Sequence, residues 1–159
     1  MIVDPVSLAT LGGAIALAGG LLGSSIGIAN AGSAGTATLS EDPGQFRNVI
    51  VLASLPMTQT FYGLIVLILV LVRVIPTLQG MPEIGGSGFA IFSIGIIAAC
   101  AEAFSAIYQG SVCASGISLL PKTKGRILTN TMMLAVFVEL IGVLGLVFTI
   151  LALTMLHLF

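Results

Sequence analysis

Charged residues divide the chain into four long apolar segments. A membrane-spanning helix needs about 20 apolar residues to cross the hydrocarbon layer of a bilayer, and each segment is at least that long. Two of the segments contain a single carboxylate, Glu102 in the third and Glu139 in the fourth. With these two exceptions, the segments free of Asp, Glu, Lys and Arg are 5–40, 48–72, 84–121 and 127–159.

We predict one helix in each segment. Lipid offers no hydrogen bonds to an open backbone, and the sequence lacks the alternating pattern that is typical of a membrane barrel. The predicted fold class is therefore an all-α membrane protein with four transmembrane helices. These helices are expected at about 8–39, 46–75, 86–119 and 126–156.

The connections indicate two helical hairpins. Residues 40–46 join the first two helices, residues 121–126 join the last two, and residues 76–88 connect the halves. Similar stretches, NAGSAGTATL and YQGSVCASGISLL, precede the two short loops, which indicates an internal duplication. The expected units are a first hairpin, 1–80, and a second hairpin, 81–159.

Composition supports a membrane location. Hydrophobic types make up 57% of the 159 residues and charged types only 7%, too few to cover a soluble domain. A net charge of −1 argues against nucleic acid as a partner. Cys100 and Cys113 form no metal-binding pattern and are expected to be buried thiols. No basic residue precedes the first apolar segment, so we expect no cleaved signal peptide.

Basic residues predict the orientation of the helices. Most Lys and Arg lie at the two short loops, whereas the opposite side carries only Arg73. The positive-inside rule therefore places loops 40–46 and 121–126 in the cytoplasm and both termini outside. The residues that carry this prediction are Arg47, Lys122, Lys124 and Arg126.

Small residues predict which helices pack closely. They recur every four residues in the first and third predicted helices, a spacing that lets helix backbones approach one another. The second and fourth helices are bulky, so we expect the first and third to form an inner layer. Seams this long favour a closed homo-oligomeric ring, although ordinary packing within a monomer is the alternative. The seams contain Gly19, Gly23, Gly27, Ala31 and Gly35, and Ala98, Ala106, Gly110 and Ala114.

Polar side chains converge at one depth in the membrane. Gln59 and Glu139 each lie fourteen residues beyond a short loop, counted from Gln45 and Gly125, and Gln109 lies twelve residues before Pro121. At ~1.5 Å per helical residue, all three side chains are ~18–21 Å from the short-loop side. Thr58 adjoins Gln59 in the same row. Interhelical hydrogen bonding is one explanation of the amides, but a carboxylate at this depth is typical of an ion pathway.

The chemistry of this row favours a monovalent cation. Pro56 lacks an N–H group and therefore frees a backbone carbonyl close to Thr58 and Gln59. Every candidate ligand is an oxygen, which suits a hard cation. A single carboxylate balances Na⁺ or H⁺ but would leave Ca²⁺ with excess charge. A proton needs only the carboxyl group, so the additional oxygens favour Na⁺ over H⁺.

At these residues the sequence resembles the ring proteolipids of V-type rotary ATPases, the four-helix K or c subunits, over essentially its whole length. The most specific stretches are LPMTQTFYG, FSAIYQG and VFVELIGVLG. The first is similar to the motif L-P-x-T-Q-x-x-Y-G of Na⁺-transporting bacterial members. The resemblance implies Na⁺ ligands at the backbone carbonyl of Leu55 and the side chains of Thr58, Gln59, Gln109 and Glu139. It also implies that Tyr62 closes the site by a hydrogen bond to Glu139.

The resemblance implies a rotary mechanism and a set of partners. Copies of the chain would form a ring beside a stator subunit with an essential arginine, and central-stalk subunits would contact the cytoplasmic loops. Lipid would surround the ring in a bacterial cell membrane. A separate soluble sector would hydrolyse ATP, since this chain lacks a phosphate-binding motif G-x-x-x-x-G-K-[ST] and is not catalytic alone.

Glu102 departs from the sodium motif, which does not require a carboxylate there. It lies seven residues before Gln109, on about the same helix face and ~10 Å further from the short loops. The simpler interpretation is a protonated carboxyl hydrogen-bonded to a neighbouring backbone or hydroxyl group. The alternative is a candidate secondary carboxylate that interacts with a cation or lines the interior of the ring.

Three other functions are possible on the residues alone. An H⁺-carrying rotor would use Glu139 without the surrounding oxygens. A small secondary transporter would couple Glu139 to a substrate, and a channel would conduct passively. Neither of the last two accounts for the complete motif that begins at Leu55.

Overall fold

The computed structural model describes residues 4–81 and 86–158, and in this part of the chain four apolar helices are long enough to cross a membrane. The first is α1 (Pro5–Glu41), the third is α5 (Ser87–Ser118) and the fourth is α7 (Leu128–Met155). The second span consists of η1 (Pro43–Gln45), α2 (Phe46–Ser54), η2 (Leu55–Met57), α3 (Thr58–Leu69), η3 (Val70–Val74) and α4 (Ile75–Gly80).

The four predicted spans are confirmed, and their ends differ from prediction by a few residues. The largest difference is in the second span, which was expected to end at residue 75 before Pro76 but continues to Gly80. The turn before the proline, Val70–Val74, is a π-helix. A π-helical turn is wider than an α-helical one, and so it accommodates a ring that would otherwise clash with the preceding turn.

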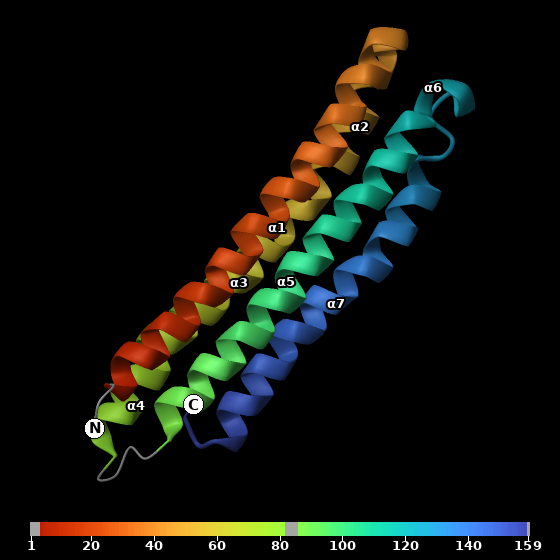
Figure 1. The fold of residues 1–159 in the computed structure, drawn as a ribbon. Helices are drawn as coiled ribbons and strands as arrows, with labels where there is room; N and C mark the ends of the chain where they lie inside the picture. The colour runs from red at the N-terminus through yellow and green to blue at the C-terminus, as the bar shows by residue number, and fades with distance from the viewer. Residues whose placement is uncertain (1–3, 82–85, 159) are drawn as a thin grey trace.

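The helices run side by side as two hairpins (Figure 1). One short connection contains η1, and the other contains the one-turn helix α6 (Leu120–Thr123). The second connection closes through Lys124 and Gly125, which both have positive φ angles of 51° and 80°. Figure 1 places α2 and α6 at one end of the bundle, called here the short-loop end, and both termini at the other.

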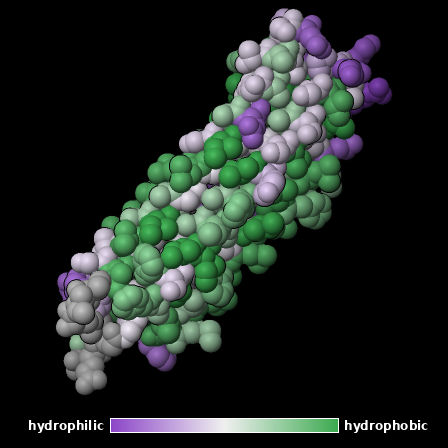
Figure 2. All heavy atoms as spheres, in the orientation of Figure 1, coloured by the Kyte–Doolittle hydropathy of each residue, from purple (hydrophilic) through white to green (hydrophobic). Residues whose placement is uncertain are grey.

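The surface is apolar along the length of the bundle. Figure 2 shows hydrophobic side chains along the middle of the visible face and hydrophilic atoms gathered at the short-loop end. Large side chains such as Leu22, Phe61, Phe137 and Leu144 are exposed on the single chain. Such a surface is stable against lipid or against other protein, but not in water. Exposed Cys100 belongs to this surface, so its predicted burial is wrong, whereas Cys113 is buried as expected.

Helices α1 and α5 are in backbone contact along a glycine seam. A Cβ atom at Gly23 would lie 2.6 Å from the Cα of Ala103, and one at Gly12 would lie 2.8 Å from the Cα of Phe92. Gly27 packs against Ala106 in the same way. The predicted close approach is therefore confirmed. On α5, however, the seam includes Ala103, which the predicted row of small residues omits.

The outer helices pack on this central pair. A Cβ at Gly63 of α3 would lie 2.6 Å from the carbonyl oxygen of Ala16 in α1. On the other side, α7 packs along α5, where Gly142 and Gly145 face the α5 side chains Ala101 and Glu102. Each hairpin thus contributes one helix to the centre and one helix that presents mostly bulky apolar side chains.

Candidate ion-binding site

The site begins where the second span loses its α-helical geometry. Pro56 is buried and provides no N–H group, and the three residues Leu55–Met57 form a tight 3-10 turn. The carbonyl of Leu55 accepts the backbone N–H of Thr58 and also its hydroxyl, with an oxygen–oxygen distance of 3.2 Å. The turn fits against α1, because a Cβ at Gly27 would lie 2.8 Å from the Cβ of Pro56.

Three oxygens gather at this turn. The Thr58 hydroxyl lies 3.2 Å from the Leu55 carbonyl and 3.2 Å from Oε1 of Gln59. Carbonyl, hydroxyl and amide oxygens are neutral ligands of the kind that hard cations prefer. The 3-10 turn thereby places one main-chain oxygen and two side-chain oxygens close together.

The amide of Gln59 connects this turn to α5. Gln59 is fully buried, and its Nε2 donates to Oε1 of Gln109 and to the hydroxyl of Ser105, each at 3.0 Å. Buried amides are stable only when hydrogen-bonded, so these bonds fix the orientation of both side chains. The Oε1 of Gln59 is consequently directed towards Thr58.

Glu139 completes the arrangement from α7. One carboxylate oxygen accepts a hydrogen bond of 3.2 Å from Nε2 of Gln109, and the other accepts one of 3.1 Å from the hydroxyl of Tyr62. Gln109 also donates to the carbonyl of Ala135 at 3.4 Å. Glu139 is half-buried on the single chain. Its carboxylate is thus held by two donors, on helices α3 and α5, at the apolar surface of the bundle.

The structure brings all six site residues that the sequence predicts into one continuous hydrogen-bonded cluster. The predicted common depth explains this result, because side chains at one level of adjacent helices can meet. That these residues bind an ion stays a prediction. The cluster links helices of both hairpins and consists of Leu55, Thr58, Gln59, Tyr62, Gln109 and Glu139.

Ser105 belongs to the cluster, although the sequence pattern did not predict it. Its side chain is buried, accepts a hydrogen bond from Gln59, and donates to the carbonyl of Val138 at 2.9 Å. Ser105 lies four residues before Gln109 and therefore on the same face of α5. That spacing was the one signal in the sequence that pointed to it.

Glu102 lies beside the cluster without a hydrogen bond. It is fully buried, and within the described residues neither of its carboxyl oxygens has a hydrogen-bond partner. The expected bond to a backbone or hydroxyl group is therefore absent. The reason is local: the side chain points at Gly142 and Gly145, which have no side chains to offer.

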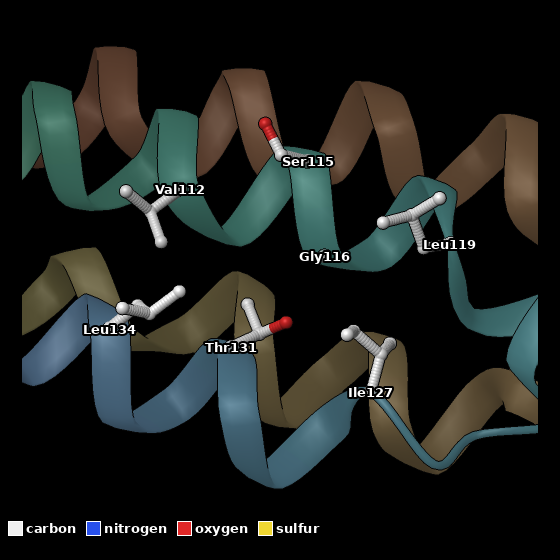
Figure 3. Close-up of a pocket in the computed structure, with 7 residues that line it drawn as sticks. All are labelled: Val112, Ser115, Gly116, Leu119, Ile127, Thr131 and Leu134. Atoms are coloured by element: carbon white, nitrogen blue, oxygen red, sulfur yellow. The ribbon is translucent and has the colours of Figure 1, made fainter.

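One surface pocket is separate from the polar cluster. It has a volume of about 300 Å³ and lies between α5 and α7, near the short-loop end (Figure 3). None of the predicted ion ligands lines it, and most of its walls are apolar. Its lining residues are Val112, Ser115, Gly116, Leu119, Ile127, Thr131 and Leu134.

Comparisons with known proteins agree with this architecture. The family of the ATP synthase C subunit matches the chain twice, over residues 11–70 and 92–152, which supports a duplicated hairpin. The A-type ATP synthase subunit K of Methanocaldococcus jannaschii is 34% identical over 151 residues. That alignment covers 95% of this chain but 64% of the relative, so the chain spans less than two thirds of that protein.

A second relative is similar in length. The V-type sodium ATPase subunit K of Enterococcus hirae is 32% identical over 133 residues, which cover 82% of this chain and 80% of the relative. Both repeats of the family model fall on the membrane-spanning helices, and the polar cluster lies within the matched ranges. The chain therefore belongs to the family of the ATP synthase C subunit.

Proposed function

We propose that this protein is a rotor ring subunit of a V- or A-type ATPase and that it carries Na⁺ across the membrane on Glu139. The observation that carries the proposal is the cluster of uncharged oxygens beside a single carboxylate. Leu55, Thr58 and Gln59 supply carbonyl, hydroxyl and amide oxygens, and Gln109 joins them to Glu139. One negative charge among neutral oxygens matches one monovalent cation.

The electrostatics of Glu139 explain how binding would be tied to rotation. An ionised carboxylate facing lipid is unfavourable, whereas a carboxylate neutralised by Na⁺ can face lipid at small cost. Glu139 is half-buried at the apolar surface of the single chain. A protomer with a bound ion can therefore travel through lipid, and an empty one must meet a positive group, which we assign to a stator arginine.

Tyr62 would act as the closing group of the site. Its hydroxyl donates to Glu139 from α3, while Gln109 donates to the other carboxylate oxygen from α5. A donor on each side holds the carboxylate against the bundle. Release of the cation would require that these hydrogen bonds to Glu139 open. Tyr62 is half-buried on the single chain, so an adjacent copy of the chain could contact it in the proposed ring.

The apolar surface of the chain supports the proposed assembly. Its apolar faces would contact further copies in a closed ring and surrounding lipid, with a stator subunit at one point of the circumference. Central-stalk subunits would bind the short loops, which we place in the cytoplasm of a bacterial cell. The division into hairpins at residues 80 and 81 is part of this proposal, and residues 82–85 of the connection lie outside the described residues. ATP hydrolysis belongs to other subunits, and nucleic acid is not a partner.

The proposal is tested by equilibrium binding of radioactive Na⁺ to the purified oligomer across a pH series. We expect saturation near one ion per chain and loss of binding in Glu139→Gln. Glu41→Gln is the matched control, because Glu41 is exposed at the short-loop end of α1 and should leave binding unchanged.

Carbodiimide labelling separates Na⁺ from H⁺ as the carried ion. The reagent modifies a protonated carboxyl, so Na⁺ bound at Glu139 should protect that residue near neutral pH. If pH alone governs labelling and Na⁺ has no effect, the protein is an H⁺ carrier. Substrate transport by isolated chains in liposomes would instead indicate a secondary transporter.

A further inference from the structure

Glu102 is a buried carboxyl of the described transmembrane helices that the proposed ion cycle does not use. It lies on α5, is fully buried, and neither of its oxygens is hydrogen-bonded within residues 4–81 and 86–158. Burial of an ionised carboxylate without a partner costs several kcal/mol. The same side chain as a neutral acid avoids most of that cost.

Two glycines of α7 make room for the Glu102 carboxyl. A Cβ at Gly142 would lie 2.7 Å from its Oε2, and a Cβ at Gly145 would lie 3.6 Å from its Oε1. Any other residue at position 142 would have to displace the carboxyl group. The Glu102 carboxyl therefore fills space left by the glycines of α7, and Gly142 lies about one turn beyond Glu139 on that helix.

Ser105 and Gln59 of the cluster lie near this carboxyl. The same Cβ position at Gly142 lies 3.2 Å from the Ser105 hydroxyl and 3.3 Å from Cγ of Gln59, so these groups surround one point on α7. Ser105 donates its only hydroxyl proton to the carbonyl of Val138 and accepts from Gln59. A hydroxyl oxygen can accept two hydrogen bonds, so one acceptor position remains for a donor.

The free acceptor position of Ser105 can pair with a protonated Glu102 but not with an ionised Glu102. A carboxylate only accepts hydrogen bonds, and Ser105 has no further proton to give. A protonated carboxyl has a proton to donate, and the free acceptor position of Ser105 can receive one.

The other titratable groups around Glu102 also disfavour a second negative charge. Glu139 on α7 and Tyr62 on α3 lie on the ion-site side, and neither is positive. On α5 itself, Cys100 and Tyr108 are exposed and Cys113 is buried further towards the short-loop end. From α1 the packing residues are glycines, and no titratable side chain occurs between Asp4 and Glu41.

We propose that Glu102 is a proton-binding site in each chain, a neutral carboxylic acid for which the unfilled acceptor position of Ser105 is available, and that it does not take part in ion exchange at Glu139. The inference builds on the Na⁺ function proposed above and adds to it. Because Glu102 stays neutral, the cluster has one negative charge and accepts one monovalent cation.

Infrared spectroscopy of the purified oligomer tests the protonation state directly. In Glu139→Gln, Glu102 is the one membrane-embedded carboxyl of the described helices, and we expect the C=O stretch of a protonated acid near neutral pH. The band should be absent from the double variant Glu139→Gln/Glu102→Gln. It should shift in Glu139→Gln/Ser105→Ala, because the acid loses its acceptor. Absence of the band in Glu139→Gln would overturn the proposal, and an unchanged band without Ser105 would overturn the pairing.

Na⁺ binding to Glu102→Gln gives the second readout. A glutamine amide is neutral, similar in size, and still a donor, so we expect the wild-type Na⁺ affinity. A unit charge within one or two helical turns changes cation affinity on the order of tenfold or more in a protein interior. A loss of that size would show that Glu102 is ionised. If the wild-type oligomer itself binds no Na⁺, the proposed ion is wrong, while the infrared bands still decide the state of Glu102.

Discussion

At the scale of single residues, the site is defined by how few of its polar atoms carry charge. Glu139 is the sole carboxylate bonded within the cluster, and its neighbours are amides, hydroxyls and backbone carbonyls. Each amide uses its N–H groups to hold another side chain, and the amide oxygen of Gln59 lies beside the Thr58 hydroxyl. In the proposed function, one charge would attract a cation and neutral oxygens would select it.

Removal of the Tyr62 hydroxyl should weaken the site. Tyr62→Phe leaves one oxygen of Glu139 without its 3.1 Å donor, and a hydrogen bond to a charged group contributes about 1.5–3 kcal/mol. We expect Na⁺ affinity to fall on the order of tenfold in equilibrium binding.

Tyr108→Phe is the matched control for Tyr62→Phe. Tyr108 is exposed and stacks on Phe104, with ring centroids 6.4 Å apart. Its variant should bind Na⁺ like the wild type. Equal affinities for both tyrosine variants would contradict a closing role for Tyr62.

The sequence was sufficient to predict which six residues come together in the cluster, but not Ser105. Hydroxyl side chains in these helices mostly donate to the carbonyl four residues earlier, as Ser111 and Ser115 do. Ser105 instead donates across to α7. The choice between these two bonds depends on the distance to a neighbouring helix, which a single sequence does not contain. The predicted hydrogen bond of Glu102 was wrong for the same reason, because it depends on which residues of α7 face Glu102.

At the scale of elements, two departures from α-helical geometry shape the second span. The 3-10 turn at Pro56 presents the Leu55 carbonyl to the site, and the π-turn at Val70–Val74 allows the span to continue past Pro76. Both prolines can be seen in the sequence, but the helix geometry around them differs. Pro56 has Gly27 of α1 against it, whereas Pro76 follows a turn that has already widened. Helix ends near prolines could therefore be predicted only approximately.

The glycine seam gives a prediction at this scale. Gly23→Ala places a methyl group 2.6 Å from the Cα of Ala103, so α1 and α5 must separate. We expect the variant to lose about 1–3 kcal/mol of stability, as overpacked cores do. Thermal unfolding of the purified protein in detergent would show this loss as a lower midpoint.

Gly32→Ala controls for the helix propensity of alanine. A Cβ at Gly32 meets nothing within 4 Å, so this variant should keep or slightly raise the stability, by up to about 1 kcal/mol. If the two alanine variants unfold at the same temperature, the close approach of α1 and α5 does not limit stability.

At the scale of the whole molecule, the two hairpins have similar folds but unequal roles. The first supplies Leu55, Thr58, Gln59 and Tyr62, and the second supplies Gln109 and Glu139. Neither hairpin contains a complete cluster. The spacing of the hairpins in the sequence predicted the duplication. The pairing of α1 with α5 was predicted from a different feature, the small residues on both helices.

The proposed orientation can be tested with a single cysteine. Thr123→Cys in a Cys100→Ala background places a thiol at the end of α6, beside the basic residues of the short loop. We expect a membrane-impermeant maleimide to label it in inverted vesicles but not in intact cells. Labelling in intact cells would reverse the topology and place the termini in the cytoplasm.

The seam between α1 and α5 also has a mechanical consequence. Where backbones touch, no flexible side chains lie between them, so the pair resists sliding and bending more than helices separated by long side chains. In the proposed rotor, force enters near Glu139 and leaves at the short-loop end. A stiff pair of helices along that path would transmit torque with little elastic twist, so each step of the ring would reach the stalk with little delay.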